Sequence, residues 1–364
     1  MAAISITPLH NWGVGVELGK PLFISGPCSA ETEEQVLETC IRLAKKPSVH
    51  ILRAGIWKPR TRPNSFEGVG SVGLSWLKEA GKETGLPVCT EVANAKHVYE
   101  ALRMGIDILW IGARTTVNPF AVQEIADALV GVDIPVMVKN PVNPDIELWI
   151  GAFERLNYAG ITKVAAIHRG FSAYGKHKYR NRPQWEIPIE LMRRYPDLPI
   201  ICDPSHICGT REFLGEIAQK AMDLNFSGLM IESHIHPNKA LSDAEQQLVP
   251  EMYHQLIEGL VMRKSTTVDA TFLHNLEELR EIINEFDEKI IELIGQRMNV
   301  SKQIGRYKKA TGITILQNAR WDEIIHTRCE HGLKAGLSVD FTEALYNAIH
   351  KESIQHQASV MNEK

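Results

Sequence analysis

The sequence lacks an excess of charge of one sign, and it lacks long hydrophobic runs. Lys and Arg number 40 against 44 Asp and Glu, a formal net charge of -4, so no broad basic field exists to bind nucleic acid. No segment approaches the roughly 18 uninterrupted apolar residues of a membrane span. The first residues, MAAISITPLHNWGVG, have neither the basic nor the apolar region of a signal peptide. We expect a cytoplasmic protein that binds neither nucleic acid nor membrane.

Cysteines are few and far apart. They form no CxxC pair and no dense framework, which argues against a disulfide scaffold. We interpret them as thiols, with one a candidate metal ligand. The six are Cys28, Cys40, Cys89, Cys202, Cys208 and Cys329.

What is present, from Leu22 to about Arg263, is an alternation of short apolar runs with longer segments of helical period. This alternation is typical of parallel βα units. Eight units favour a closed (β/α)8 TIM barrel, in which catalytic groups lie at the carboxyl ends of the strands. The eight candidate strands begin at Leu22, His50, Pro87, Ile108, Pro135, Lys163, Pro199 and Gly228.

Four residues have the chemistry of metal ligands, and three of them end predicted strands or begin the loops that follow. The set mixes one soft ligand with borderline and hard ones, which suits Mn²⁺, Fe²⁺, Co²⁺ or Zn²⁺ better than Ca²⁺. A simpler interpretation makes the cysteine a small buried residue and the glutamate an ion-pair partner. The four residues are Cys28, His206, Glu232 and Asp243.

Cations also gather at the predicted strand ends, and six of them come from four strands. Arginine forks and lysine point charges bind phosphate and carboxylate groups, and six cations are too many for a monoanion. The sequence therefore predicts a polyanion site. Its residues are Arg53, Lys58, Arg60, Arg114, Lys139 and Arg169.

The pattern changes after Arg263, where a polar segment precedes a long run without proline. We predict a barrel over residues 1–263, a linker over 264–272 and an all-α domain over 273–364. The run from Leu276 to Ala310 has a heptad seam, and so long a helix needs a partner, which predicts a homodimer. The seam is Leu276, Leu279, Ile283, Phe286, Ile290, Leu293, Arg297, Val300, Ile304 and Tyr307.

One seam position, Arg297, is charged, and a buried charge requires an anionic partner or ligand. Arg280, Lys308 and Arg320 could surround the same cavity in a dimer. Ordinary solvated helix charges are the alternative for Arg280 and Lys308. On the last predicted helix the residues at every fourth position pass from apolar into polar groups, ending at Ser353 and Gln357. These positions indicate a second anion site.

The barrel motifs GPCS, RAGIWKPRTRPNSFEG, DILWIGAR, VKNP, HRG, DPSH and ESHIHPNKALSD resemble those of 3-deoxy-D-arabino-heptulosonate 7-phosphate (DAHP) synthases over about residues 1–262. The resemblance implies condensation of phosphoenolpyruvate with erythrose 4-phosphate. It makes Cys28, His206, Glu232 and Asp243 the metal ligands. Phosphoenolpyruvate would be held by Arg53, Lys58, Arg114, Lys139 and Arg169, and the aldose phosphate by Arg60 and Thr61. Lys58 is the candidate proton shuttle, or only a point charge.

Residues 273–360 resemble the all-helical chorismate mutases, through LREIINEFDEKIIELIGQRMNVSKQIGRYK, ARWDEI and KESIQHQ. The resemblance implies rearrangement of chorismate to prephenate in an intertwined dimer. It assigns Arg297, Lys308, Arg320, Ser353 and Gln357 to one chain and Arg280 to the partner chain, with Lys308 and Gln357 donating to the ether oxygen. The chain departs from the family pattern at two positions, which carry Gln317 and Trp321 in place of an aspartate and a glutamate.

The sequence thus predicts a bifunctional enzyme of aromatic amino acid biosynthesis. Two alternatives remain open. In one, the helical domain is only a regulatory and dimerisation module that senses chorismate or prephenate, which Gln317 and Trp321 favour. In the other, the barrel uses a different aldose, against which the KPRT motif argues.

Overall fold

The computed structural model describes residues 4–59, 65–175, 177–264, 266–316 and 318–362. The chain divides into two compact units, residues 1–265 and 266–364. Each unit is described by itself. None of the helices in the described ranges is long and apolar enough to cross a membrane.

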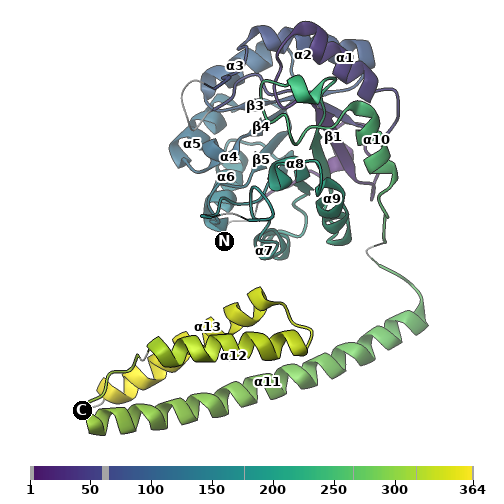
Figure 1. Ribbon diagram of the computed structural model, residues 1–364. Coiled ribbons are helices and arrows are strands. Elements are labelled where there is room, and N and C mark those ends of the chain that lie inside the picture. Colours follow the sequence, from purple (N-terminus) through teal and green to yellow (C-terminus); the bar gives the residue numbers. More distant parts are fainter. Residues whose placement is uncertain (1–3, 60–64, 176, 265, 317, 363–364) are drawn as a thin grey trace. The chain divides into compact units, whose positions relative to one another are not determined.

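The first unit is a closed barrel of eight parallel strands in sequence order, with β8 paired to β1 (Figure 1). All eight predicted strands are present, and the (β/α)8 prediction is confirmed. Nearly every strand residue is buried, as expected of a parallel sheet covered on its outer face by helices. The strands are β1 Leu22–Gly26, β2 Ile51–Arg53, β3 Val88–Val92, β4 Ile108–Ile111, β5 Val136–Lys139, β6 Val164–His168, β7 Ile200–Cys202 and β8 Gly228–Glu232.

Helices follow the strands and cover the barrel, several of them capped by side chains such as Thr32 and Asn94 that accept a hydrogen bond from the first turn. They are α1 Glu33–Leu43, α2 Val72–Thr84, α3 Ala95–Arg103, α4 Ala113–Thr116, α5 Pro119–Ala128, α6 Ile146–Tyr158, α7 Glu186–Arg194, α8 Pro204–Cys208, α9 Leu214–Asp223 and α10 Pro250–Glu258. Short 3₁₀ turns lie at Leu9–Asn11 and Pro237–Lys239.

The barrel has two apolar layers. One lies between the strands and the helices, and the other fills the barrel interior. The amino-terminal segment adds Trp12, Val14 and Val16 to the interior layer. Its Thr7 contacts Thr162, just before β6 begins, so this segment covers the amino-terminal end of the barrel. The segment does not cover the opposite end of the barrel, where the carboxyl ends of the strands lie.

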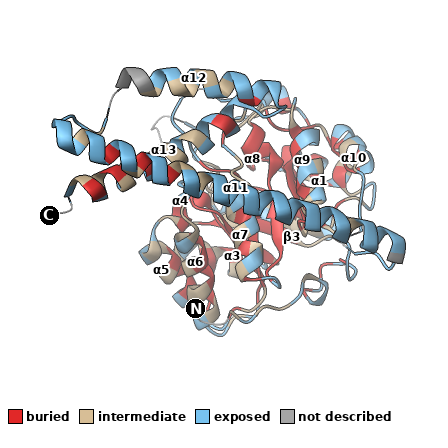
Figure 2. Cartoon of the chain, turned by 90° about the horizontal axis from the view of Figure 1, so that it is seen from below, coloured by how far each residue is buried: buried red, intermediate tan, exposed pale blue. Residues whose placement is uncertain are grey.

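The second unit consists of three helices, α11 Ala270–Thr311, α12 Asn318–Lys334 and α13 Val339–Asn362. The long helix α11 begins inside the predicted linker and has Asp269 as its amino-terminal cap. It packs against α13 through Met298, Ser301 and Gly305, which are buried. The heptad seam adjoins this face, and its Arg297 contacts Ser353 of α13, but most of the seam is exposed in the single chain (Figure 2).

Candidate functional site

The carboxyl ends of the barrel strands surround a charged cavity. Seven predicted or strand-end polar groups line it, together with Arg180, which no sequence pattern indicated. The side chains come from seven successive βα segments, so only closure of the barrel brings them together. The lining residues are Lys58, Pro59, Glu91, Ala113, Arg114, Lys139, Arg169, Arg180, His206 and Asp243.

Three of the four predicted metal ligands form one cluster. Cys28, Glu232 and Asp243 offer ligand atoms that lie within 4.8 Å of one another. The Cys28 thiol donates to Asp243 Oδ2 over 3.3 Å. His206 adjoins the cluster, with Nε2 3.7 Å from Glu232 Oε1. One thiol, one imidazole and two carboxylates fit a divalent transition ion. Glu232 Oε1, which is buried, accepts no hydrogen bond from the described residues.

Electrostatics at this cluster depend on burial and on nearby cations. Burial, with help from Glu232, raises the pKa of the Cys28 thiol to about 12. Burial opposes ionisation of Glu232, but His206 and Arg53 outweigh it and hold the pKa of that carboxyl below its usual range. Lys58 Nζ lies 3.0 Å from Cys28 Sγ. Burial disfavours its charge, yet Cys28 and Glu232 raise the pKa of Lys58 above its ordinary value.

Arg53 is not among the residues that line the cavity, and it is only 1% exposed. Its Nη2 is 3.2 Å from Glu232 Oε1, and its guanidinium stacks over the Trp110 ring at 4.8 Å. Its Nε and Nη1 donate to no acceptor in the described residues. A buried arginine with unused donors is a ready site for an anionic ligand.

A second buried network joins Lys139, of the predicted anion site, to His206 beside the candidate metal-ligand cluster. Lys139 Nζ donates to Asp203 Oδ2 over 2.9 Å, and His206 Nδ1 lies 2.8 Å from the same oxygen. Burial opposes ionisation of Asp203, but His206 and Lys139 hold its pKa well below the usual range. Asp203 thereby orients His206 so that Nε2 faces Glu232.

Sequence reasoning missed two residues of the site. Asp203 was visible as a strand-end carboxylate in DPSH but received no role. Arg180 follows β6 within a polar loop and carries no strand-end signal, yet its Nη1 donates to Asp243 Oδ1 over 2.9 Å. The predicted Arg60 and Thr61 lie outside the described residues.

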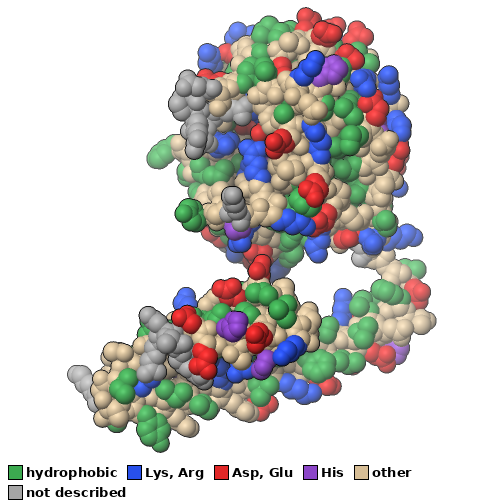
Figure 3. Space-filling model, in the orientation of Figure 1, with side chains coloured by type: hydrophobic (Ala, Val, Ile, Leu, Met, Phe, Trp, Pro, Cys, Tyr) green, Lys and Arg blue, Asp and Glu red, His purple; other side chains and the backbone are tan. Residues whose placement is uncertain are grey.

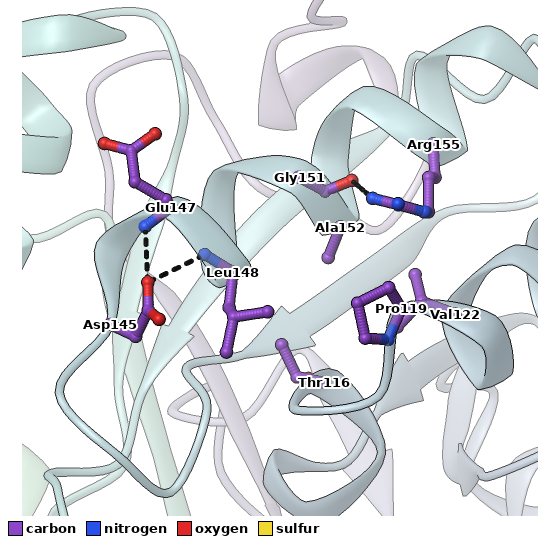
Figure 4. A pocket seen from close by; sticks show the side chains of 9 residues that line it. All are labelled: Thr116, Pro119, Val122, Asp145, Glu147, Leu148, Gly151, Ala152 and Arg155. Atoms are coloured by element: carbon purple, nitrogen blue, oxygen red, sulfur yellow. Dashed lines mark hydrogen bonds between the residues drawn. The ribbon is translucent and has the colours of Figure 1, made fainter.

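A further cavity, of about 270 Å³, lies on the outside of the barrel between α5 and α6 (Figure 4). Its polar groups are engaged locally. Asp145 accepts from the amides of Glu147 and Leu148, and Arg155 donates to the Gly151 carbonyl. Its lining residues include no cluster of buried titratable groups, so we place the candidate active site at the barrel mouth.

In the helical unit, α11 and α13 bring three predicted residues together. Arg297 Nη1 donates to Ser353 Oγ over 2.5 Å. Gln357 lies one turn beyond Ser353, buried, and its Oε1 accepts no hydrogen bond from the described residues. Gly305 allows this approach, because a Cβ there would lie 3.1 Å from Gln357 Cα. Lys308 is part-buried nearby on α11, and its Nζ donates to the Ile315 carbonyl over 2.5 Å.

The remaining predicted residues of this site are not brought to it within one chain. Arg280 is exposed and pairs with Glu277 over 3.5 Å. It precedes Arg297 by 17 residues on α11, about 25 Å at 1.5 Å per residue. The side chain of Arg320 and all of Gln317 lie outside the described part. Trp321 stacks on His350 of α13, with ring centroids 3.7 Å apart.

The fold and the barrel mouth define a (β/α)8 barrel with a cavity lined by several cations at the carboxyl ends of its strands. Residues 13–268 match the DAHP synthetase I family, and residues 279–358 match chorismate mutase type II. The chain belongs to the DAHP synthetase I family, a metal-dependent family, and carries a chorismate mutase domain after the barrel. It therefore has the two domains of a bifunctional enzyme of aromatic amino acid biosynthesis.

Individual relatives agree with this assignment. Phospho-2-dehydro-3-deoxyheptonate aldolase of Thermotoga maritima is 34% identical over 247 residues, 67% of this chain and 71% of that protein. A 2-dehydro-3-deoxyphosphooctonate aldolase of Legionella pneumophila is 28% identical over 272 residues, 68% of this chain and 93% of that protein. The crystal structure of the Thermotoga maritima DAHP synthase matches with a TM-score of 0.62 at 31% identity, covering 70% of this chain and 72% of that one.

Proposed function

We propose that the barrel condenses phosphoenolpyruvate with erythrose 4-phosphate and releases phosphate. The cavity of converging cations and the neighbouring Cys28, Glu232 and Asp243 cluster is the observation that carries this proposal. We assign the metal to Cys28, His206, Glu232 and Asp243. When bound, a divalent transition ion supplies a Lewis acid that polarises the aldehyde of the aldose.

The cations hold the phosphoenolpyruvate. The unused donors of Arg53, the buried Lys139 and Arg169 and the exposed Arg114 supply charge for its phosphate and carboxylate. Holding both reactants in fixed positions makes the bimolecular step effectively unimolecular, which lowers the activation free energy by several kcal/mol. Arg60 and Thr61 are assigned to the aldose phosphate by their place in KPRT.

Lys58 is assigned as the proton donor to the hydroxyl that forms during condensation. Its raised pKa keeps Nζ protonated near neutral pH, and the ammonium lies beside the metal cluster at Cys28. From there it delivers a proton toward the hydroxyl that forms from the aldehyde oxygen. The alternative is that Lys58 acts only as a fixed positive charge.

The test of the barrel proposal is phosphate release by the purified chain. We expect release that requires both phosphoenolpyruvate and erythrose 4-phosphate together with a divalent ion. Arabinose 5-phosphate is the comparison, because it is the alternative aldose that carries one more carbon than erythrose 4-phosphate. Faster turnover with arabinose 5-phosphate would overturn the choice of aldose but not the reaction class.

We infer that the helical unit rearranges chorismate to prephenate in a homodimer. Arg297, which donates to Ser353, the part-buried Lys308 and the buried Gln357 supply two cations and an amide along α11 and α13. This pericyclic reaction needs a compact substrate conformer and stabilisation of charge on the ether oxygen, with no nucleophile. Arg280 of the partner chain and Arg320 complete the cation set.

Loss of chorismate absorbance on addition of the purified chain tests this inference. Trp321 on His350 is the specific observation behind a second candidate function, in which the helical unit only senses chorismate or prephenate. Binding of prephenate without any turnover of chorismate would support the sensing module instead of the mutase.

A further inference from the structure

Two consecutive glutamines, Gln246 and Gln247, lie in the loop after β8 and are both 0% exposed. Neither has a strand-end position or a charge, so no sequence pattern indicated them. A buried amide must satisfy two donors and a carbonyl within the protein. The partners of these two amides are the residues that carry the metal-ligand cluster.

Gln246 links Glu232 directly, and Asp243 through Arg180. Its side-chain nitrogen donates to Glu232 Oε2 over 2.7 Å, and its Oε1 accepts from Arg180 Nη1 over 3.0 Å. The same Arg180 nitrogen donates to Asp243 Oδ1. Glu232 is thus held through one oxygen while its Oε1 stays without a hydrogen bond in the described structure.

Gln247 bridges the two loops from which the other ligands come. Its Oε1 accepts the backbone amide of Cys28 over 2.9 Å, and its nitrogen donates to the Ser242 carbonyl over 2.8 Å. The hydroxyls of Ser29 and Ser242 meet at 2.6 Å beside it. The side-chain amide of Gln247 therefore connects Cys28, two residues after β1, to Ser242, the residue before Asp243.

The backbone at Asp243 requires such support. Its φ of 48° lies in the left-handed region, which only a few non-glycine residues occupy. A residue keeps this conformation when its surroundings determine it from several sides. The Gln247 side chain donates to the preceding carbonyl, that of Ser242, and the backbone N–H of Gln246 donates to the Asp243 carbonyl over 3.2 Å.

We propose that Gln246 and Gln247 are positioning residues that fix the mutual spacing of Cys28, Glu232 and Asp243 and thereby set the affinity of the barrel for its divalent ion. The inference rests on the metal site proposed above. Groups that orient metal ligands through hydrogen bonds typically change metal affinity by about 10–100-fold when they are removed.

The experiment titrates Mn²⁺ into the full-length chain, prepared free of metal, and measures free Mn²⁺ by electron paramagnetic resonance. Gln246→Leu and Gln247→Leu each remove one bridging amide at similar volume. We expect each to raise the Kd for Mn²⁺ by about 10–100-fold. The matched control is Gln123→Leu on α5, where the amide donates to Asp127 in the same helix. Its Kd should equal that of the wild type.

Thermal unfolding of the metal-free variants separates positioning from general support. A structural role alone lowers the Tm of the metal-free protein and leaves the Kd within twofold of the wild type, which overturns the proposal. If the Leu variants do not fold, Gln247→Asn keeps an amide that is one methylene too short for both bridges. The same increase in Kd is expected for it, and an unchanged Kd again overturns the proposal.

Failure of the metal site itself has a different signature. A wild-type chain that binds no Mn²⁺, or a Cys28→Ala variant that binds as tightly as the wild type, removes the site and this inference with it. If Cys28→Ala binds Mn²⁺ weakly while both glutamine variants bind it as tightly as the wild type, the metal site stands and only the role proposed for the glutamines is excluded.

Discussion

Arg169, a single residue of the cation cluster, illustrates the folding free energy that is lost when like charges are buried together. It is buried near Arg180 and Arg114, and burial together with these like charges lowers its pKa to about 10. A buried cation beside other cations costs folding free energy. A bound polyanion offsets this cost, so we attribute the cluster to binding and not to stability.

Arg169→Gln should therefore separate binding from stability. We expect the KM for phosphoenolpyruvate to rise by about 10²-fold, as for loss of one preorganised charge. The Tm of the ligand-free chain should not fall, since like-charge repulsion is relieved. Steady-state kinetics and thermal unfolding measure the two effects, with the exposed Arg103→Gln as control. A lower Tm with an unchanged KM would contradict this account.

Arg297 is the corresponding residue of the helical unit. Removing its guanidinium in Arg297→Ala should lower chorismate turnover by about 10²-fold or more, because a charge aimed at the substrate is lost. The condensation reaction should keep its wild-type rate. The control is Arg306→Ala, an exposed arginine on the same helix. Equal losses in the two variants would show that Arg297 has no special role.

At the scale of one element, α11 has two apolar faces. One face, with Met298 and Ser301, packs on α13 within the chain. The other is the heptad seam, where Phe286 is 58% and Ile290 is 53% exposed. Hydrophobic side chains are visible along this helix in Figure 3. Exposed apolar surface of this extent indicates an interface between chains, which supports the proposed homodimer.

Ile290→Glu should dissociate that homodimer. A charge in an apolar seam must be desolvated on association, at a cost of several kcal/mol. Sedimentation equilibrium should show a dimer for the wild type and a monomer for the variant. The monomeric variant should also lose mutase activity, since it has no partner chain to supply Arg280. Asn284→Glu adds the same charge to an exposed polar position of α11 and should leave the dimer intact.

At the scale of the whole molecule, two chemistries with different needs share one chain. The barrel gathers metal-ligand groups at its strand ends, whereas the helical site consists of cations, a hydroxyl and an amide. A pericyclic rearrangement needs no Lewis acid beyond such groups. The two activities should therefore respond differently to one reagent.

Chelation tests that difference on a single preparation. Treatment with EDTA should abolish condensation and leave chorismate turnover unchanged, because the proposed metal site lies in the barrel and the mutase reaction requires no metal. Added Mn²⁺ should restore condensation. Cys28→Ala should behave like the chelated wild type and should not be restored. Condensation that persists after complete metal removal would exclude the proposed ligand set.

Much of the barrel could be predicted because its signals are local. Each strand is a short buried run, and the polar residues that matter, such as Cys28, Arg53 and Lys139, follow directly at its end. Asp203 was visible in the same way, but its role depends on Lys139 and His206, which local patterns do not connect.

The amino-acid sequence by itself determined the eight strands, the long heptad helix and the residue types at both sites, because hydrophobic period and residue chemistry are properties of neighbouring positions. Only the tertiary structure decided which partners meet. Arg180 reaches Asp243 from 63 residues away, and Gln247 reaches Cys28 across 219. Barrel closure sets these contacts, and no local period encodes a distance between loops so far apart in the chain.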